Sequence, residues 1–266
     1  MNASALPKGQ REFGFASLGS GSQGNATLIA KGGSGVIIDC GFGPKELARR
    51  LLRLGFAVEQ LAGIVVTHEH SDHIAGVGAV ARRYGVPVWM SHGTWFAAAD
   101  SIGEVPDLRF IEAENPFAID ALEFRPITVP HDAREPRQFR VSDGRACIGI
   151  VTDLGSSTPH LLKALAGCEA LLLEFNHDSA LLQASAYPEF LKARIQGPWG
   201  HLSNSEAALI LAQLAGPGLR HFVAAHLSEK NNSPHKAGTA AAEALGCRVD
   251  EVLIACQSEG SPWLSV

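Results

Sequence analysis

Apolar residues recur along the chain in two alternating patterns, one typical of strands and one of helices. Short apolar or β-branched runs predict strands at residues 13–18, 26–30, 36–39, 64–67, 86–90, 122–129, 147–152, 170–175, 222–225 and 249–254. Apolar positions three or four apart predict helices at residues 44–54, 74–84, 159–166, 203–214 and 234–245. This alternation favours a layered α/β fold, with helices outside the sheets and a functional site at strand ends.

Length and composition add a prediction about domains. The chain has 266 residues, of which 46% are hydrophobic, so it can bury a substantial core. It contains no low-complexity tract, short repeat or linker rich in Pro, Gly or Ser that would divide it. We therefore expect one domain that spans residues 1–266.

Cysteine usage and hydropathy favour a cytoplasmic protein. The five cysteines, Cys40, Cys147, Cys168, Cys247 and Cys256, form no C-x-x-C pair and leave an odd count, which argues against a disulfide framework and a thiolate zinc site. Residues 1–20 carry no continuous apolar core of signal-peptide length, and no stretch approaches a membrane span. The formal charge of -5 gives no global electrostatic case for nucleic-acid binding, although a local basic patch is compatible with it.

Side chains that can bind metals are most concentrated in residues 67–73, Thr-His-Glu-His-Ser-Asp-His, directly after an apolar run. Alternate side chains of an extended chain share a face, so His68 and His70 can bind one cation together. Asp72 and His73 follow around a turn and lie close enough to this pair to bind a second cation. Imidazole and carboxylate groups are the donors that zinc and its neighbours prefer. The alternative is a solvated loop with incidental histidines.

A two-metal site needs further ligands from distant strands. His131, Asp153 and His226 each end an apolar strand-like run, where rigid scaffolds tend to place chemistry. Any one of them alone would more often be a structural residue. Together with the cluster at residues 68–73 they complete a binuclear ligand set.

With these residues the chain resembles the metallo-β-lactamase superfamily over nearly its whole length. The resemblance implies an αββα sandwich, in which two mixed sheets are flanked by helices. It implies that His68, His70 and His131 bind one metal, that Asp72, His73 and His226 bind the other, and that Asp153 joins them. Asp39, which ends the run 36–38, matches the carboxylate that supports the site from behind the ligands.

Further motifs narrow the resemblance to a phosphodiesterase branch. Residues 171–178, 200–207 and 226–228 follow in the order of tRNase Z-type enzymes, in which a Glu and a His, here Glu174 and His201, help to protonate the leaving oxygen. Residues 20–25 and 226–232 are similar to the WalJ (YycJ-like) group, associated with exonuclease activity on DNA. This similarity assigns Ser22, Asn25 and Asn231 to substrate contacts, although Lys230 stands where that group would carry an acidic residue.

A basic segment follows His131 in this otherwise acidic chain. Residues Arg134, Arg137, Arg140 and Arg145 are opposed by Asp132, Glu135 and Asp143. Arginine suits phosphate oxygens, so Arg134 and Arg137 are candidate substrate contacts. A solvated charged surface explains the same composition equally well.

The sequence thus predicts a two-metal phosphodiesterase, foremost a DNA exonuclease-like nuclease, in which a metal-bridging hydroxide attacks phosphorus. Asp39, Asp72, Glu174 and His201 are the catalytic candidates. Two zinc ions are the default cofactors, and manganese or iron also suits the carboxylates. The alternatives are a phosphoribosyl cyclic phosphodiesterase, a thioester or β-lactam hydrolase and a non-catalytic metal-binding protein. The expected partner is a phosphodiester substrate, not a membrane, and the oligomeric state, a homodimer included, is left open.

Overall fold

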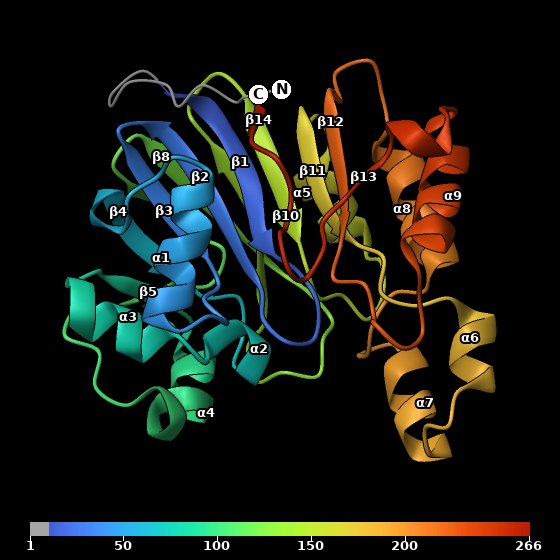
Figure 1. Cartoon of the computed structure of the whole chain (residues 1–266), viewed down its shortest axis with the longest axis horizontal. Helices are drawn as coiled ribbons and strands as arrows, with labels where there is room; N and C mark the ends of the chain where they lie inside the picture. Colours follow the sequence, from blue (N-terminus) through green and yellow to red (C-terminus); the bar gives the residue numbers. More distant parts are fainter. Residues whose placement is uncertain (1–10) are drawn as a thin grey trace.

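Two sheets face each other and carry helices on their outer sides, in a computed structural model that describes residues 11–266 (Figure 1). Residues 1–10 lie outside the described residues, so the prediction that residues 1–20 carry no signal-peptide core falls partly outside them. The expected αββα sandwich is confirmed. Among the described helices, none is long and apolar enough to cross a membrane.

The first sheet is mixed. Its order is β14 (Leu264–Ser265), β1 (Arg11–Gly19), β2 (Ala26–Gly32), β3 (Ser34–Ile38), β4 (Leu61–Val65), β5 (Val88–Met90) and β6 (Leu108–Phe110). Strands β1 to β3 pair antiparallel, whereas β3 to β6 run parallel. The carboxyl ends of β3 and β4 therefore lie at the same edge.

The second sheet has the same mixture. Its order is β13 (Leu253–Ile254), β12 (His221–Ala225), β11 (Ala170–Glu174), β10 (Cys147–Val151), β9 (Arg137–Ser142), β8 (Leu122–Thr128) and β7 (Phe117–Ile119). Strands β10 to β13 are parallel, and β9 is antiparallel to both β10 and β8. Strands β8, β10, β11 and β12 consequently share one direction, and their carboxyl ends gather at one edge.

Helices cover both outer faces. Helices α1 (Pro44–Arg53), α3 (Val77–Tyr84) and α4 (His92–Ile102) lie on the side of the first sheet, and α5 (Pro159–Leu165), α8 (Asn204–Leu214) and α9 (Pro234–Leu245) on the side of the second. The short helices α2 (Ser71–Ile74), α6 (Ser179–Ala184) and α7 (Glu189–Gln196) lie at the lower edge in Figure 1. Two 3₁₀ turns, η1 (Val58–Gln60) and η2 (Val249–Glu251), complete the regular structure.

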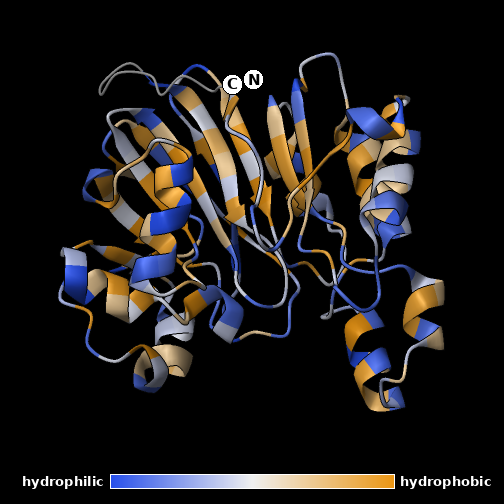
Figure 2. Cartoon of the chain, in the orientation of Figure 1, coloured by the Kyte–Doolittle hydropathy of each residue, from blue (hydrophilic) through white to orange (hydrophobic). Residues whose placement is uncertain are grey.

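The sheets share a central core. Phe15 and Ile29 of the first sheet and Phe124 and Phe139 of the second belong to one buried cluster. Separate clusters join each sheet to its helices, and Figure 2 shows mostly apolar strands beside helices whose residues alternate between apolar and polar. Because the two halves bury side chains against each other, we propose that the chain is one domain.

The sequence predictions differ from the structure at three places. The predicted helix 74–84 is two helices that meet at Gly76, where an added Cβ would lie 1.9 Å from the carbonyl oxygen of Phe42. The predicted strand 249–254 is a 3₁₀ turn with a strand of two residues, Leu253–Ile254. Strands β6, β7, β9 and β14 and helices α4, α6 and α7 were not predicted, and most of them have too few residues for a period to be recognised.

Candidate metal centre

The residues at strand ends meet at one edge of the sandwich. His68 follows β4, His131 follows β8, Asp153 follows β10 and His226 follows β12. Asp72 and His73 lie in α2, at the same edge in Figure 1. The common strand direction explains why residues up to 158 positions apart in the sequence converge.

His68, His70 and His131 form the first group, in which one nitrogen of each ring lies within 4.8 Å of the others. His131 donates Nδ1–H to the carbonyl oxygen of Gly200 at 3.0 Å, which leaves its Nε2 3.3 Å from Nδ1 of His70. The Nδ1 atom of His68 is 2.9 Å from the hydroxyl of Thr67. Its Nε2 is buried and has no hydrogen-bond partner in the described part of the chain, as expected of a nitrogen whose partner is a cation.

Asp72, His73 and His226 form the second group. Nε2 of His73 lies 3.3 Å from Oδ2 of Asp72 and 3.1 Å from Oδ2 of Asp153. Nε2 of His226 is 3.4 Å from the same Asp72 oxygen. Asp153 also belongs to a group with His68 and His73, so it lies between the two sets. The donor set fits two divalent cations.

The pKa values divide the imidazoles in the metal-free site into two kinds. Burial lowers the pKa of His68 well below 6.5 and also lowers that of His131. Burial alone would lower the pKa of His73 and His226 too, but carboxylates led by Asp153 outweigh it. They raise the pKa of His73 well above 6.5 and that of His226 to about 10. The second group therefore holds protons that a metal would displace.

Asp39 supports the site from behind. It is 1% exposed, and its carboxylate accepts hydrogen bonds from the backbone N–H of Thr67 at 2.8 Å and from Nδ1 of His73 at 2.8 Å. The second bond directs Nε2 of His73 toward the other donors. Asp39 and His226 have φ angles of 62° and 55°, a region that costs free energy for residues other than glycine and that often marks functional sites.

Glu174 and His201 pair as the sequence analysis expected. Nδ1 of His201 lies 2.7 Å from Oε1 of the buried Glu174, whose Oε2 accepts the backbone N–H groups of Leu154 and Leu202. Burial lowers the pKa of His201, but the charge of Glu174 more than compensates and raises it. The same Oε1 lies 3.1 Å from Nδ1 of His226, a contact that the sequence analysis did not foresee.

Three expected substrate contacts are buried instead. Asn25 is 2% exposed and donates from Nδ2 to Oδ2 of Asp72 at 3.0 Å, so it holds a candidate ligand. Asn231 is 1% exposed, and its N–H donates to Ser228 within its own loop. Arg137 is enclosed and bonds to Thr128 and Glu135. Since none of these side chains is open to a large ligand, we do not propose them as substrate contacts.

Ser22 and Arg134 are exposed, as substrate contacts must be. The backbone N–H of Arg134 donates to Glu69 at 2.6 Å, which ties it to the loop that carries His68 and His70. Its guanidinium lies 4.4 Å from the ring centre of Phe96 in α4, which is 73% exposed. Phe96 was missed, because no sequence pattern relates an isolated aromatic residue to a loop so far along the chain.

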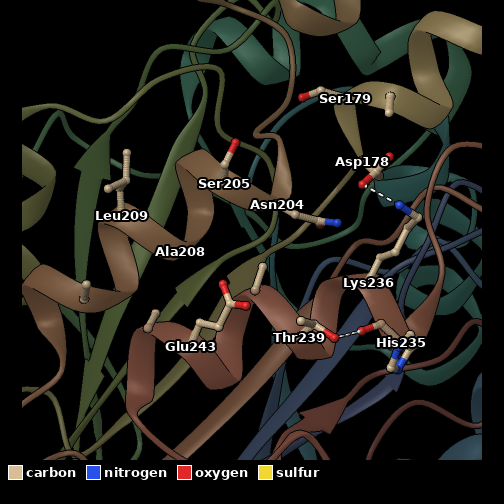
Figure 3. Close-up of a pocket in the computed structure, with 14 residues that line it drawn as sticks. Asp178, Ser179, Asn204, Ser205, Ala208, Leu209, His235, Lys236, Thr239 and Glu243 are labelled. Atoms are coloured by element: carbon tan, nitrogen blue, oxygen red, sulfur yellow. Dashed lines mark hydrogen bonds and ion pairs between the residues drawn. The ribbon is translucent and has the colours of Figure 1, made fainter.

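A groove of about 860 Å³ between α6, α8 and α9 contains none of the candidate ligands (Figure 3). Ala208 and Ala240 are among its lining residues, and Asp178 and Lys236 close one end with an ion pair of 2.9 Å. The groove is separate from the metal centre, so pocket size does not locate the chemistry in this molecule.

The fold and the candidate ligand set indicate the class of protein to which the chain belongs. Residues 19–172 match the family described as "Metallo-beta-lactamase superfamily", and the chain belongs to this superfamily. It is therefore a metal-dependent hydrolase, and the expected resemblance is confirmed. Divalent metal ions are the cofactors that this fold implies.

Individual relatives agree over most of the chain. It is 32% identical over 87% of its length to "Exodeoxyribonuclease YycJ" of Bacillus anthracis, of which 88% is covered. It is 30% identical over 83% of its length to "Exodeoxyribonuclease WalJ" of Streptococcus pneumoniae, of which 83% is covered. The metallo-β-lactamase fold protein YhfI of Bacillus subtilis matches 93% of this chain and 98% of its own with a TM-score of 0.73 at 15% identity, which supports the fold alone.

Proposed function

We propose that the chain is a two-metal phosphodiesterase that acts on DNA as an exonuclease. The observation that carries this proposal is the buried ligand set beside the Glu174–His201 pair, at the edge where the strands end. Relatives named exodeoxyribonucleases, similar over most of the chain, support the substrate class. The cytoplasm is the compartment we propose, because none of the five cysteines, all of which the structure describes, forms a disulfide.

The residues fit two cations as follows. His68, His70 and His131 would hold one, and Asp72, His73 and His226 the other, with Asp153 between them. Five imidazoles make zinc the first choice, and the carboxylates also suit manganese or iron. When bound, such ions supply Lewis acidity, which activates water and neutralises negative charge at phosphorus.

The residues around the ligands orient them and handle a proton. Asp39 fixes the ring of His73, and Asn25 holds the carboxylate of Asp72. Glu174 engages Nδ1 of His201 and raises its pKa, so the ring carries a proton that Nε2 can give to a leaving oxygen. General acid catalysis of this kind contributes about 10²- to 10⁴-fold.

Exposed residues beside the candidate metal ligands would bind the DNA strand. The Arg134 guanidinium, supported by the face of Phe96, is free to bind phosphate through its N–H donors. Trp199, which precedes Gly200 and His201, is 60% exposed and offers a ring on which a base can stack. Ser22 adds a hydroxyl on the exposed turn before β2.

The test is a substrate panel with metal-loaded protein. Stepwise shortening of end-labelled DNA, abolished by a chelator and by Asp153→Asn, is the expected result. Asp107→Asn removes an exposed carboxylate that pairs with Arg109 and serves as the matched control. Hydrolysis of a phosphoribosyl cyclic phosphate or a β-lactam by protein that leaves DNA intact would overturn the proposal.

A further inference from the structure

Two arginines face each other on the outer side of the second sheet. Arg125 of β8 and Arg140 of β9 are direct register partners. Their neighbours Phe124 and Phe139 enter the core between the sheets, so the arginines project to the opposite face. Like charges directly across two strands destabilise a sheet, which makes this pair informative.

A pocket of about 260 Å³ lies over this pair, between the strands and α5. Both arginines line it, together with His160 and Lys163 of α5 and with Glu114. His160 and Lys163 are three positions apart in the helix and therefore project to the same side. Three permanent cations thus surround a pocket that contains a single carboxylate, in a chain whose net charge is -5.

The neighbouring protein groups compensate little of this positive charge. Glu114 is engaged by Nε2 of His160 at 2.9 Å. The nearest carboxylate oxygen to Arg125 belongs to Glu123 and lies 4.0 Å away, at the limit of an ion pair. Arg140 donates from Nη2 to the sulfur of Cys147 at 3.0 Å, and its Nε has no hydrogen-bond partner among residues 11–266. An external anion would supply the missing compensation.

We propose that this pocket binds a phosphate group. Guanidinium and ammonium groups that converge from two strands and a helix suit its oxygens. The volume is below the roughly 300 Å³ that drug-sized ligands need, so the pocket fits the group itself and not a large molecule. Arg125 lies three residues, or about 10 Å, before the end of β8, and none of the candidate metal ligands lines the pocket, so the site is separate from the metal centre.

The phosphate can belong to a nucleic-acid strand or to a small phosphorylated molecule. The site is defined by the pocket residues alone and does not depend on the proposed nuclease function. A nucleic-acid strand would run from the metal centre along the surface of the protein to the pocket, whereas a small molecule would enter the pocket from solvent. The experiment therefore tests the site first and its source second.

The site is tested by calorimetric titration of metal-loaded protein with inorganic phosphate. Arg125→Ser/Lys163→Ser removes two exposed cations and spares Arg140, which is half-buried and donates to Cys147. Lys45→Ser/Arg109→Ser removes the same charge from exposed positions elsewhere and is the control. We expect the pocket variant to lose at least about 10-fold in affinity at one phosphate site, because hydrogen bonds between charged groups are strong. Hydrolysis of bis-p-nitrophenyl phosphate should stay unchanged in both variants.

Identical phosphate isotherms in the pocket and control variants would overturn the proposal. If the site is present, its source follows from single strands of 6 and 20 nucleotides and from deoxyadenosine monophosphate. A strand ligand predicts that the pocket variant weakens only the longer strand and flattens its salt dependence. A small-molecule ligand predicts weaker binding of the monophosphate with both strands unaffected.

Discussion

Asp39→Asn measures how much the metal centre depends on a residue outside the proposed ligand set. Asparagine has the same size as aspartate and tolerates the φ of 62° found here. It offers one acceptor oxygen, whereas the carboxylate uses one oxygen for the N–H of Thr67 and the other for Nδ1 of His73. The amide NH₂ must therefore face one of these two buried N–H donors.

A buried donor without an acceptor costs about 1–3 kcal/mol, or roughly 5- to 150-fold in an equilibrium constant. Loss of a partner that orients a metal ligand typically lowers affinity or activity by about 10- to 100-fold, which agrees. We expect Asp39→Asn to weaken zinc binding by this amount, measured by competition with a chromophoric chelator. Turnover should recover partly at excess zinc.

Asp120→Asn is the matched control, because Asp120 also has a positive φ, 50°, but is exposed and bonds only to Ser34 among the described residues. It should bind zinc as the unaltered chain does. Equal zinc affinity in the Asp39 and Asp120 variants would refute the role assigned to Asp39.

Three further predictions test other parts of the site. His201→Ala should keep both metals and lose about 10²- to 10⁴-fold on DNA, but much less on bis-p-nitrophenyl phosphate, whose leaving group needs no proton; equal losses would indicate damaged positioning. Zinc binding at pH 8 should release at least about one proton, from His226, because its pKa is raised to about 10 in the metal-free site; calorimetry in two buffers would contradict this if it found none. Arg134→Ala should weaken DNA binding and reduce its salt slope by about one unit, whereas Arg137→Ala should lower thermal stability and leave the slope unchanged.

The fold and the ligand set could be predicted because short-range patterns encode them. The motif at residues 68–73 concentrates donors in one turn, and strand direction then decides which distant residues join it. His131, Asp153 and His226 each follow an apolar run, so their convergence required only that β8, β10 and β12 share a direction. The apolar runs follow from periodicity in the sequence, whereas the assignment of the ligands to two metals followed from the resemblance to a known superfamily.

The substrate contacts could not be predicted, because they depend on which face of a strand or loop is buried by the rest of the fold. Arg137, Phe139 and Val141 alternate along β9 on one face, a period of two that marks Arg137 as inward. Counting charges alone groups Arg137 with Arg134, although one is enclosed and the other exposed. The bond from Asn25 to Asp72 joins a loop to α2 across 47 residues, and no local pattern records it.

The position of Glu174 limits what can be learned from mutating it. One oxygen, Oε1, serves both His201, the proposed proton donor, and His226, a proposed metal ligand. Its other oxygen accepts two backbone N–H groups, so the side chain also fixes the loops that carry Leu154 and Leu202. Replacing Glu174 would therefore disturb proton transfer, metal binding and backbone geometry together. His201→Ala leaves this carboxylate and its other hydrogen bonds in place, so a loss confined to DNA can be attributed to the proton donor.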